Sequence, residues 1–366
     1  MTSDPNSTES TLPEGRAAAR DLSDLPDHLP PVQPPSAGFI IQLFVVPAII
    51  VAVVVGLYLL FTRMASGEAD WRQLVSDIRS ENPHVRWSSA NQLATLLTDA
   101  AQQPKDPASV ALSTNREIAQ ALVTPFQELA KKTTLTDEES IQLEFLGKAI
   151  GQLNVPDLIV PPLLEAARSE RMGEAAHTLR KTSLNSLAMI VGRAREDGRL
   201  AALPADFDSQ VGLIAEDHEP LFRSQAAFVL GLSGRPEAIT RLQGMLEDPE
   251  THIRVNAAIG LARNDSKRGL PVLEEVLKES AEWKMDLPAP APGDSQEKLL
   301  KEDGIRFERI MMLKNALQAV AALAPQLSDT ERDRIATEVK RIGAEFSVIE
   351  MRSVALSAAD KLAGSK

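Results

Sequence analysis

The side chains that could do chemistry are few in this chain. There is no cysteine, and the five histidines are His28, His84, His177, His218 and His252. Without cysteine, disulfides, thiolate metal ligands and thiol nucleophiles are excluded, so histidine would have to supply metal or acid–base chemistry. His84 and His252 each stand two residues before an arginine at an expected helix start, far apart in sequence. We expect exposed residues there, and predict no metal site and no cofactor.

Other catalytic patterns are also missing from the sequence. It has no Gly-rich phosphate loop and no Ser-His-Asp spacing that stands out. The acidic run Asp137–Glu139 and the pair Arg193 and Arg195 fall at expected helix ends, where we expect solvated charges. We therefore predict no catalytic residue.

A repeated spacing of acid and arginine is the clearest motif. Asp217 precedes Arg223 by six residues, and Asp248 precedes Arg254 by six, at an offset of 31. In both copies two alanines begin three residues after the arginine and a leucine stands at seven. Weaker copies surround Arg86, Arg180 and Arg352, of which Arg180 has an acid, Glu174, six residues before it.

This spacing has a physical reading. An arginine and the residues three and seven positions later share one side of a helix. The acid falls in the turn just before, where it can cap the helix and reach the arginine of an adjacent repeat. We predict a ladder of these pairs along a stack of helices, made of Glu174, Arg180, Asp217, Arg223, Asp248 and Arg254.

The pattern Asp-x5-Arg-x2-Ala-Ala resembles the HEAT-repeat family, in the short bacterial form called lyase-type HEAT-like repeats. The resemblance covers residues 217–280, is weaker at 82–98 and 173–192, and is faint at 345–363. It implies an all-α fold, an α-solenoid of stacked helix pairs, in which each pair hides its apolar face only against its neighbours.

Helical periodicity extends over the whole region 68–366. We expect about six helix pairs with single helices at each end, and capping boxes at Thr136 with Glu139, Ser328 with Glu331, and Ser347 with Glu350. Two insertions, 102–114 and the proline-rich 286–296, interrupt the pattern; each is either a solvated loop or a partner contact.

Two enzyme classes have similar repeats. The chain resembles the fold of deoxyhypusine hydroxylase, whose di-iron site uses several His-Glu pairs, but it has one such pair, His218–Glu219. The bilin lyases share similar repeats, and no lyase signature carries over. A lyase-type enzyme that handles a chromophore or a metal stays the alternative function.

Residues 39–62 form an uncharged apolar run of 24 positions. A helix of that length spans roughly 36 Å, enough for a ~30 Å hydrocarbon core. We predict a single-pass transmembrane helix. A cleaved signal peptide, with Met64–Gly67 as its site, is the competing reading, although the run is longer than the usual apolar core of such peptides.

The segments that flank this run differ in composition. Residues 1–38 contain seven prolines among Ser, Thr and Asp, so we predict a disordered, acidic, Pro-rich tail. Residues 63–67 are a short connector. Arg63, Arg72 and Arg79 follow the run closely, against Arg20 before it, which favours a cytoplasmic solenoid and an outside tail at a bacterial inner membrane.

The charge of the chain excludes one class of partner. The formal charge is −12, and the first 62 residues carry two arginines and six carboxylates, or −4, which leaves −8 for 63–366. An acidic domain of this kind does not bind nucleic acid through general electrostatics.

These features predict a membrane-anchored, non-catalytic scaffold or assembly factor that binds other membrane proteins or a membrane complex. We expect the inner wall of the solenoid to come from helices 236–247 and 266–281. The candidate contacts there are Arg241, Gln243, Glu247, Glu274, Glu275 and Lys278. Homo-oligomers are possible, since Ala52 and Gly56 form a loose small-residue motif in the apolar run.

Overall fold

The computed structural model describes residues 37–65, 70–103, 106–170, 173–283, 285 and 295–364. All regular elements among these residues are helices, which confirms the all-α prediction. The chain divides into two units, Met1–Gly67 and Glu68–Lys366. Each unit is described by itself.

The first unit contains one long helix, α1 (Ala37–Ala65), which covers the whole apolar run and includes Pro47. Every side chain that the structure describes from Val45 to Tyr58 is exposed. The predicted tail 1–38 lies outside the described residues except for its last two positions. α1 continues through Ala65, so three residues of the predicted connector are helical.

Among the residues whose side chains the structure describes, which in the apolar run are Val45–Tyr58, no helix has both the length and the apolar character that a membrane span requires.

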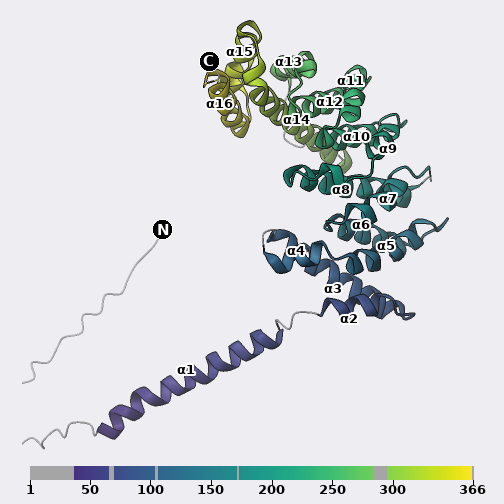
Figure 1. Ribbon diagram of the computed structural model, residues 1–366. Coiled ribbons are helices and arrows are strands. Elements are labelled where there is room, and N and C mark those ends of the chain that lie inside the picture. The colour runs from purple at the N-terminus through teal and green to yellow at the C-terminus, as the bar shows by residue number, and fades with distance from the viewer. Residues whose placement is uncertain are drawn as a thin grey trace, which may run out of the picture. The chain divides into compact units, whose positions relative to one another are not determined.

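The second unit is built of helix pairs (Figure 1), in which consecutive helices pack against each other. The described residues form seven pairs: α2 (Trp71–Ile78) with α3 (Pro83–Gln102), α5 (Arg116–Ala130) with α6 (Asp137–Gly151), α7 (Pro156–Ala167) with α8 (Glu174–Glu196), α9 (Phe207–Ile214) with α10 (Pro220–Ser233), α11 (Pro236–Gly244) with α12 (Thr251–Arg263), α13 (Leu270–Glu279) with α14 (Gln296–Leu323), and α15 (Asp329–Glu345) with α16 (Ile349–Gly364). Five 3-10 turns, η2 (Leu200–Ala202), η3 (Met245–Glu247), η4 (Lys267–Gly269), η5 (Ser280–Glu282) and η6 (Ala324–Gln326), lie between helices.

The pairs stack along an arc. Figure 1 shows α6, α8, α10, α12, α14 and α16 on the inner side of this arc and α5, α7, α9, α11, α13 and α15 on the outer side. We call these the inner row and the outer row. Consecutive helices of the inner row contact each other more extensively than consecutive helices of the outer row. The tighter row is the shorter one, so the stack bends toward it.

Small residues allow this close approach. A Cβ added at Gly231 on α10 would lie 2.7 Å from the Cα of Gly260 on α12. Likewise, a Cβ at Gly151 on α6 would lie 3.2 Å from the Cα of Ser186 on α8. The backbones of neighbouring inner helices therefore touch at these positions, and side chains larger than hydrogen do not fit.

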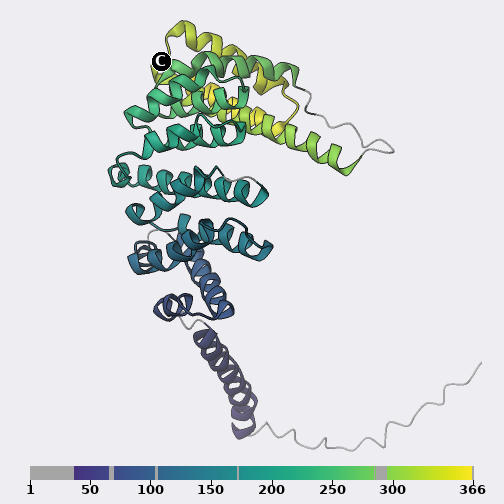
Figure 2. The same cartoon turned by 90° about the vertical axis from the view of Figure 1, so that its right-hand side faces the viewer.

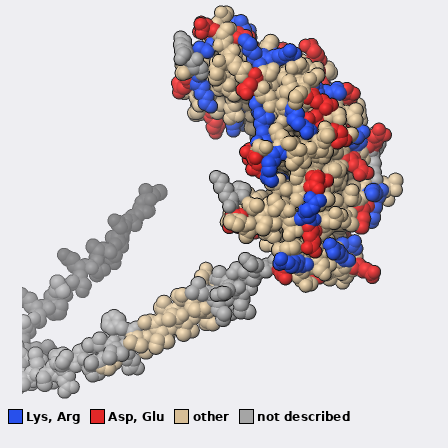
Figure 3. Space-filling model, viewed as in Figure 1, with Lys and Arg blue, Asp and Glu red and all other residues tan. Residues whose placement is uncertain are grey.

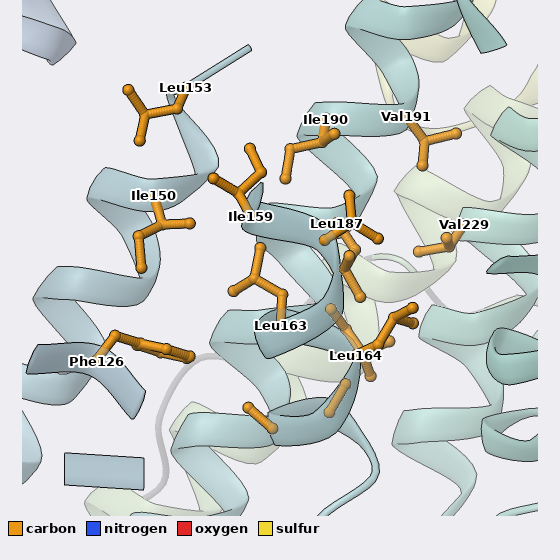
Figure 4. Packing of buried hydrophobic residues seen from close by; sticks show 14 of the residues in the cluster. Phe126, Ile150, Leu153, Ile159, Leu163, Leu164, Leu187, Ile190, Val191 and Val229 are labelled. Atoms are coloured by element: carbon orange, nitrogen blue, oxygen red, sulfur yellow. The ribbon is translucent and has the colours of Figure 1, made fainter. Parts of the chain in front are cut away.

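The core runs along the whole stack between the two rows. Figure 4 shows part of it, where Phe126 of α5, Ile150 of α6, Leu163 of α7, Leu187 of α8 and Val229 of α10 pack together. A second cluster covers the C-terminal repeats. α12 contributes residues to both clusters, so no repeat has a core of its own.

Local signals position most helix starts as predicted. Capping boxes are present at Thr136 with Glu139 and at Ser328 with Glu331. α16 begins at Ile349, two residues after Ser347. The insertion 102–114 is not simply a loop, because it contains the short helix α4 (Pro107–Ser113), which packs on α3. Most of the other insertion, 286–294, lies outside the described residues.

The backbone contact between α10 and α12 gives a direct stability test. We expect Gly231→Ala to destabilise the fold by about 1–3 kcal/mol, because the new methyl group meets backbone that cannot move freely. Gly244→Ala is the matched control: nothing lies within 4 Å of its added Cβ, so the change should be neutral or stabilise by up to about 1 kcal/mol. Urea unfolding of both variants measures the difference. Equal effects of the two changes would refute the close contact.

Candidate protein-interaction surface

The acid–arginine spacing produces ion pairs that cross from one repeat to the next. Arg223 of α10 binds Asp248, in the turn before α12, through Nε–Oδ2 at 2.9 Å and Nη2–Oδ1 at 3.1 Å. Arg180 of α8 pairs through Nη2 with Asp217, in the turn before α10, while its Nε donates to the carbonyl of Ala167. The structure thus brings four of the six predicted ladder residues together as two pairs.

Each ladder acid also accepts a hydrogen bond within its own turn. Asp217 accepts a hydrogen bond from the backbone N–H of Glu219, and Asp248 accepts one from that of Glu250, both at 2.9 Å. Arg223 in turn donates from Nη1 to the carbonyl of Asp217 at 3.0 Å. One carboxylate therefore fixes the start of its own helix and ties it to the previous repeat.

The ladder ends at Arg254. This arginine donates to the carbonyls of Asp248 and Pro249, at 2.9 and 3.1 Å, and pairs with no acid among the described residues. Glu174 lies in the first turn of α8 and likewise has no arginine partner within the described part of the chain. The two outer members of the predicted ladder are thus not linked across repeats.

The pairing lowers the proton affinity of both acids. Burial alone would raise the pKa of Asp217, but the Glu219 amide and the Arg180 guanidinium together lower it below its usual value. For Asp248, burial again opposes the shift, and Arg223 and the Glu250 amide lower the pKa. Both carboxylates are therefore ionised in the folded chain at neutral pH.

Arg193 and Arg195 are not the solvated charges that we expected. Arg193 donates to the carbonyls of Gly151 and Leu153 at the end of α6. Arg195 donates to the carbonyl of Leu232 at 3.0 Å and to Oδ1 of Asn264 at 2.8 Å. They satisfy carbonyls at the ends of other inner helices, 37 to 42 residues away in sequence. Their side chains are only partly exposed.

Asn264 completes this arrangement, and no motif in the sequence identified it. Its Nδ2 donates to the carbonyls of Gly231 and Gly260, each at 2.8 Å. Because these glycines mark the contact between α10 and α12, Asn264 closes the same seam by hydrogen bonding. An asparagine one residue after a helix end would have been the one available hint.

The six predicted contact residues lie on the wrong side for an inner wall. They belong to α11, η3 and α13, which stand in the outer row (Figure 1). Several hold the outer row together: Arg241 pairs with Glu216, Gln243 accepts a hydrogen bond from Arg268, and Glu274 accepts one from Arg334. Our placement assumed that the helix after each motif helix faces inward. The small residues of the motif helices instead bring that row closer together and so to the inside.

The inner row leaves large apolar side chains uncovered. Met189 on α8 and Phe228 on α10 are 42% and 43% exposed, and Ile259 on α12 is partly exposed. Amide side chains bridge the same helices: Gln225 donates to Asn185 at 3.2 Å, and Asn256 donates to Ser224 at 2.7 Å. Figure 3 shows the inner side as a hollow with Lys and Arg side chains near its centre.

A hollow of about 270 Å³ lies between α10, α12 and α14. Its lining residues come from these three inner helices: Phe228, Asn256, Ile259, Arg263, Asn315, Gln318, Ala319 and Ala322. We call it the inner pocket.

The described residues contain no group of three or more His, Cys, Asp or Glu side chains placed to share a metal ion. His84 lies in α3 and His252 in α12, in separate repeats. His218 lies beside Asp217 and Glu219 in the turn before α10, where it is 76% exposed.

Comparison with known proteins supports the repeat assignment. A family model described as HEAT repeats matches residues 211–285, which confirms the predicted HEAT-like repeats over 217–280. No curated protein matches the chain by sequence.

Solved structures of similar shape are distant. YibA of Escherichia coli is 16% identical, with 80% of this chain and 92% of that chain covered and a TM-score of 0.34. The CpcE–CpcF complex of phycocyanin lyase from Nostoc is 17% identical, with 80% and 94% covered and a TM-score of 0.36. Human deoxyhypusine hydroxylase is 16% identical, with 81% and 97% covered and a TM-score of 0.28. At these values the likenesses carry no conclusion about activity or partners.

The ladder predicts unequal costs for two aspartate substitutions. The side chains of Arg223 and Asp248 are only 13% and 9% exposed, so Asp248→Ala leaves a nearly buried guanidinium without its carboxylate. We expect a loss of about 2–4 kcal/mol in unfolding free energy. Asp157→Ala removes an exposed ion pair with Arg116 and should change stability little. Equal losses in urea unfolding would contradict the structural role of the ladder.

The same acids predict how stability depends on pH. A carboxyl whose pKa is lowered by folding contributes stability above its unfolded pKa of about 3.9, and loses it as pH falls through the folded value. We therefore expect the unfolding free energy to drop as pH falls below about 4. In the Asp217→Asn, Asp248→Asn double variant, that drop should be smaller, because two of the titrating groups are gone. Parallel pH profiles for the two proteins would show that the ladder acids do not contribute.

Proposed function

We propose that this chain is a non-catalytic protein-binding scaffold that is held at a membrane by residues 39–62 and binds membrane proteins on the inner row. The observation that carries the binding role is the uncovered apolar surface of that row. Monomeric proteins rarely leave large apolar side chains in a contiguous exposed patch unless the patch binds something. Met189, Phe228 and Ile259 lie on three successive inner helices.

The shape of the repeat stack supports the same role. A solenoid presents an extended concave surface, along which a partner can contact several repeats at once. Bridging amides such as Asn185 and Gln225 lie beside the apolar side chains, and the mixture of the two is typical of protein interfaces.

The membrane attachment is proposed from the sequence and from α1. The run 39–62 has no formal charge, and α1 extends over all of it. Its described side chains from Val45 to Tyr58 are apolar or small apart from Tyr58, and all are exposed. A helix that is apolar all round needs an apolar environment, and lipid supplies one. We propose a single pass with the solenoid in the cytoplasm, as the Lys/Arg distribution favours.

Fractionation tests the attachment. We expect the full chain to stay in the membrane pellet after alkaline carbonate extraction, and the chain without 39–62 to appear in the supernatant. A full chain released by carbonate, or a deleted chain that stays in the pellet, would contradict the anchor.

Site-specific photo-crosslinking in intact membranes tests the binding surface. A photoreactive phenylalanine analogue at Met189 or Phe228 should give adducts with other polypeptides. The same analogue at Lys278 on the outer row should give few, because that position lies on the opposite side of the stack. Adducts from Lys278 alone would place the client on the outer row. A chromophore or stoichiometric metal in the purified protein would favour the lyase-type enzyme instead.

A further inference from the structure

One cation in the inner pocket has no hydrogen-bond or ion-pair partner among the residues that the structure describes. The guanidinium of Arg263, at the end of α12, forms no hydrogen bond and no ion pair with any described residue, and its Nη1 is completely buried. Almost every buried polar atom in a folded protein is hydrogen-bonded, so each exception needs an explanation. The other pocket residues are amides and apolar side chains, none of which neutralises a charge.

The surroundings of Arg263 hold it in place without neutralising it. Its guanidinium carbon lies 5.5 Å from the centre of the Phe228 ring, a cation–π contact. Its Nη1 would lie 3.4 Å from a Cβ at Gly231, so the glycine seam makes room for it. The neighbouring charge is a second cation, Arg195. Burial, with a smaller effect of Arg195, lowers the pKa of Arg263.

A carboxylate is the group that would complete this site. Guanidinium N–H groups form a planar fork that matches the two oxygens of a carboxylate. An unpaired, partly buried charge is costly for the fold, and a ligand carboxylate that pairs with it would offset that cost. The pocket has about 270 Å³, room for a single side chain rather than a folded domain.

The remaining lining favours a peptide as the carrier of that carboxylate. Asn256, Asn315 and Gln318 each have an amide that can both donate and accept, as a peptide backbone requires of its partner. The exposed Phe228 offers an apolar face. A lipid phosphate group would offer acceptors only, and the net charge of −8 over 63–366 opposes an anionic bilayer.

We propose that the inner pocket binds an aspartate or glutamate side chain of an extended segment of the client protein, with Arg263 as its ion-pair partner. This inference rests on the proposed function, because it assumes that the inner row binds a polypeptide. Beyond the proposed function, the inference names the kind of residue that the client must present and the position in the solenoid that binds it.

Affinity selection with a peptide pool tests this pairing. The full chain, immobilised in detergent, is exposed to N-acetylated, C-amidated nonapeptides randomised at every position, and the retained peptides are sequenced by mass spectrometry. We expect Asp and Glu to be enriched among them. Arg263→Gln should lose this enrichment and bind the selected acidic peptides about tenfold or more weakly, as expected when a desolvated charge pair is broken.

The controls separate recognition from folding. Arg268→Gln also removes an arginine, but one that is exposed in η4 and donates to Gln243 in the outer row, and it should keep the acidic preference. Arg263→Gln should unfold at the same temperature as the wild type or higher, because it removes an uncompensated charge. A lower unfolding temperature would mean that Arg263 is structural, and would overturn the proposal.

The remaining outcomes are also decisive. Peptides retained without acidic preference, and equally by Arg263→Gln, would overturn this inference and leave the proposed scaffold role standing. Retention of no peptide by any variant would overturn it too, and the photo-crosslinking at Met189 and Phe228 would then decide separately whether the inner row binds proteins.

Discussion

The close approach of the inner helices is the constraint on which the rest of the structure depends. Where Gly231 meets Gly260, and Gly151 meets Ser186, backbone lies against backbone, and the inner row becomes shorter than the outer row. The stack must then bend toward the inner row (Figure 2 shows the same stack from its outer side). The hollow, and therefore the surface available to a client, follows from the size of a few side chains.

The polar interactions reinforce the same seam. The ladder of Arg180 with Asp217 and Arg223 with Asp248 fixes one end of the inner helices, and Arg193, Arg195 and Asn264 satisfy carbonyls at the other end. Both sets join separate repeats, and each is largely shielded from water. Arg263 stands beside the second set and pairs with no acid among the described residues, which is why we assign it to a ligand rather than to the fold.

The sequence was informative wherever a structural rule is local. The acid six residues before an arginine predicted a hydrogen bond inside its own turn, because that turn contains both groups. The spacing also indicated a pair with the arginine of an adjacent repeat, and the structure has that pair with the preceding repeat. The capping boxes at Thr136 and Ser328 followed from the same kind of rule. Arg193 and Arg195 could not be predicted, because the carbonyls that they bind belong to helices distant in sequence. The sequence also could not predict which row of helices faces inward. That depends on whether the helices of one row lie closer together than those of the other, and no single helix determines it. For that reason the candidate contacts from Arg241 to Lys278 were assigned to the wrong wall.

The direction of the bend is the central claim. Distances between spin labels, measured by double electron–electron resonance, test it directly. The chain has no cysteine, so pairs of spin labels can be introduced without removing any native thiol. One pair joins exposed positions of the inner row, Asn185 on α8 and Gln318 on α14, and the other joins Glu165 on α7 and Lys278 on α13 in the outer row. We predict a shorter distance for the inner pair than for the outer pair, although both span the same four repeats. An equal or longer inner distance would contradict the account.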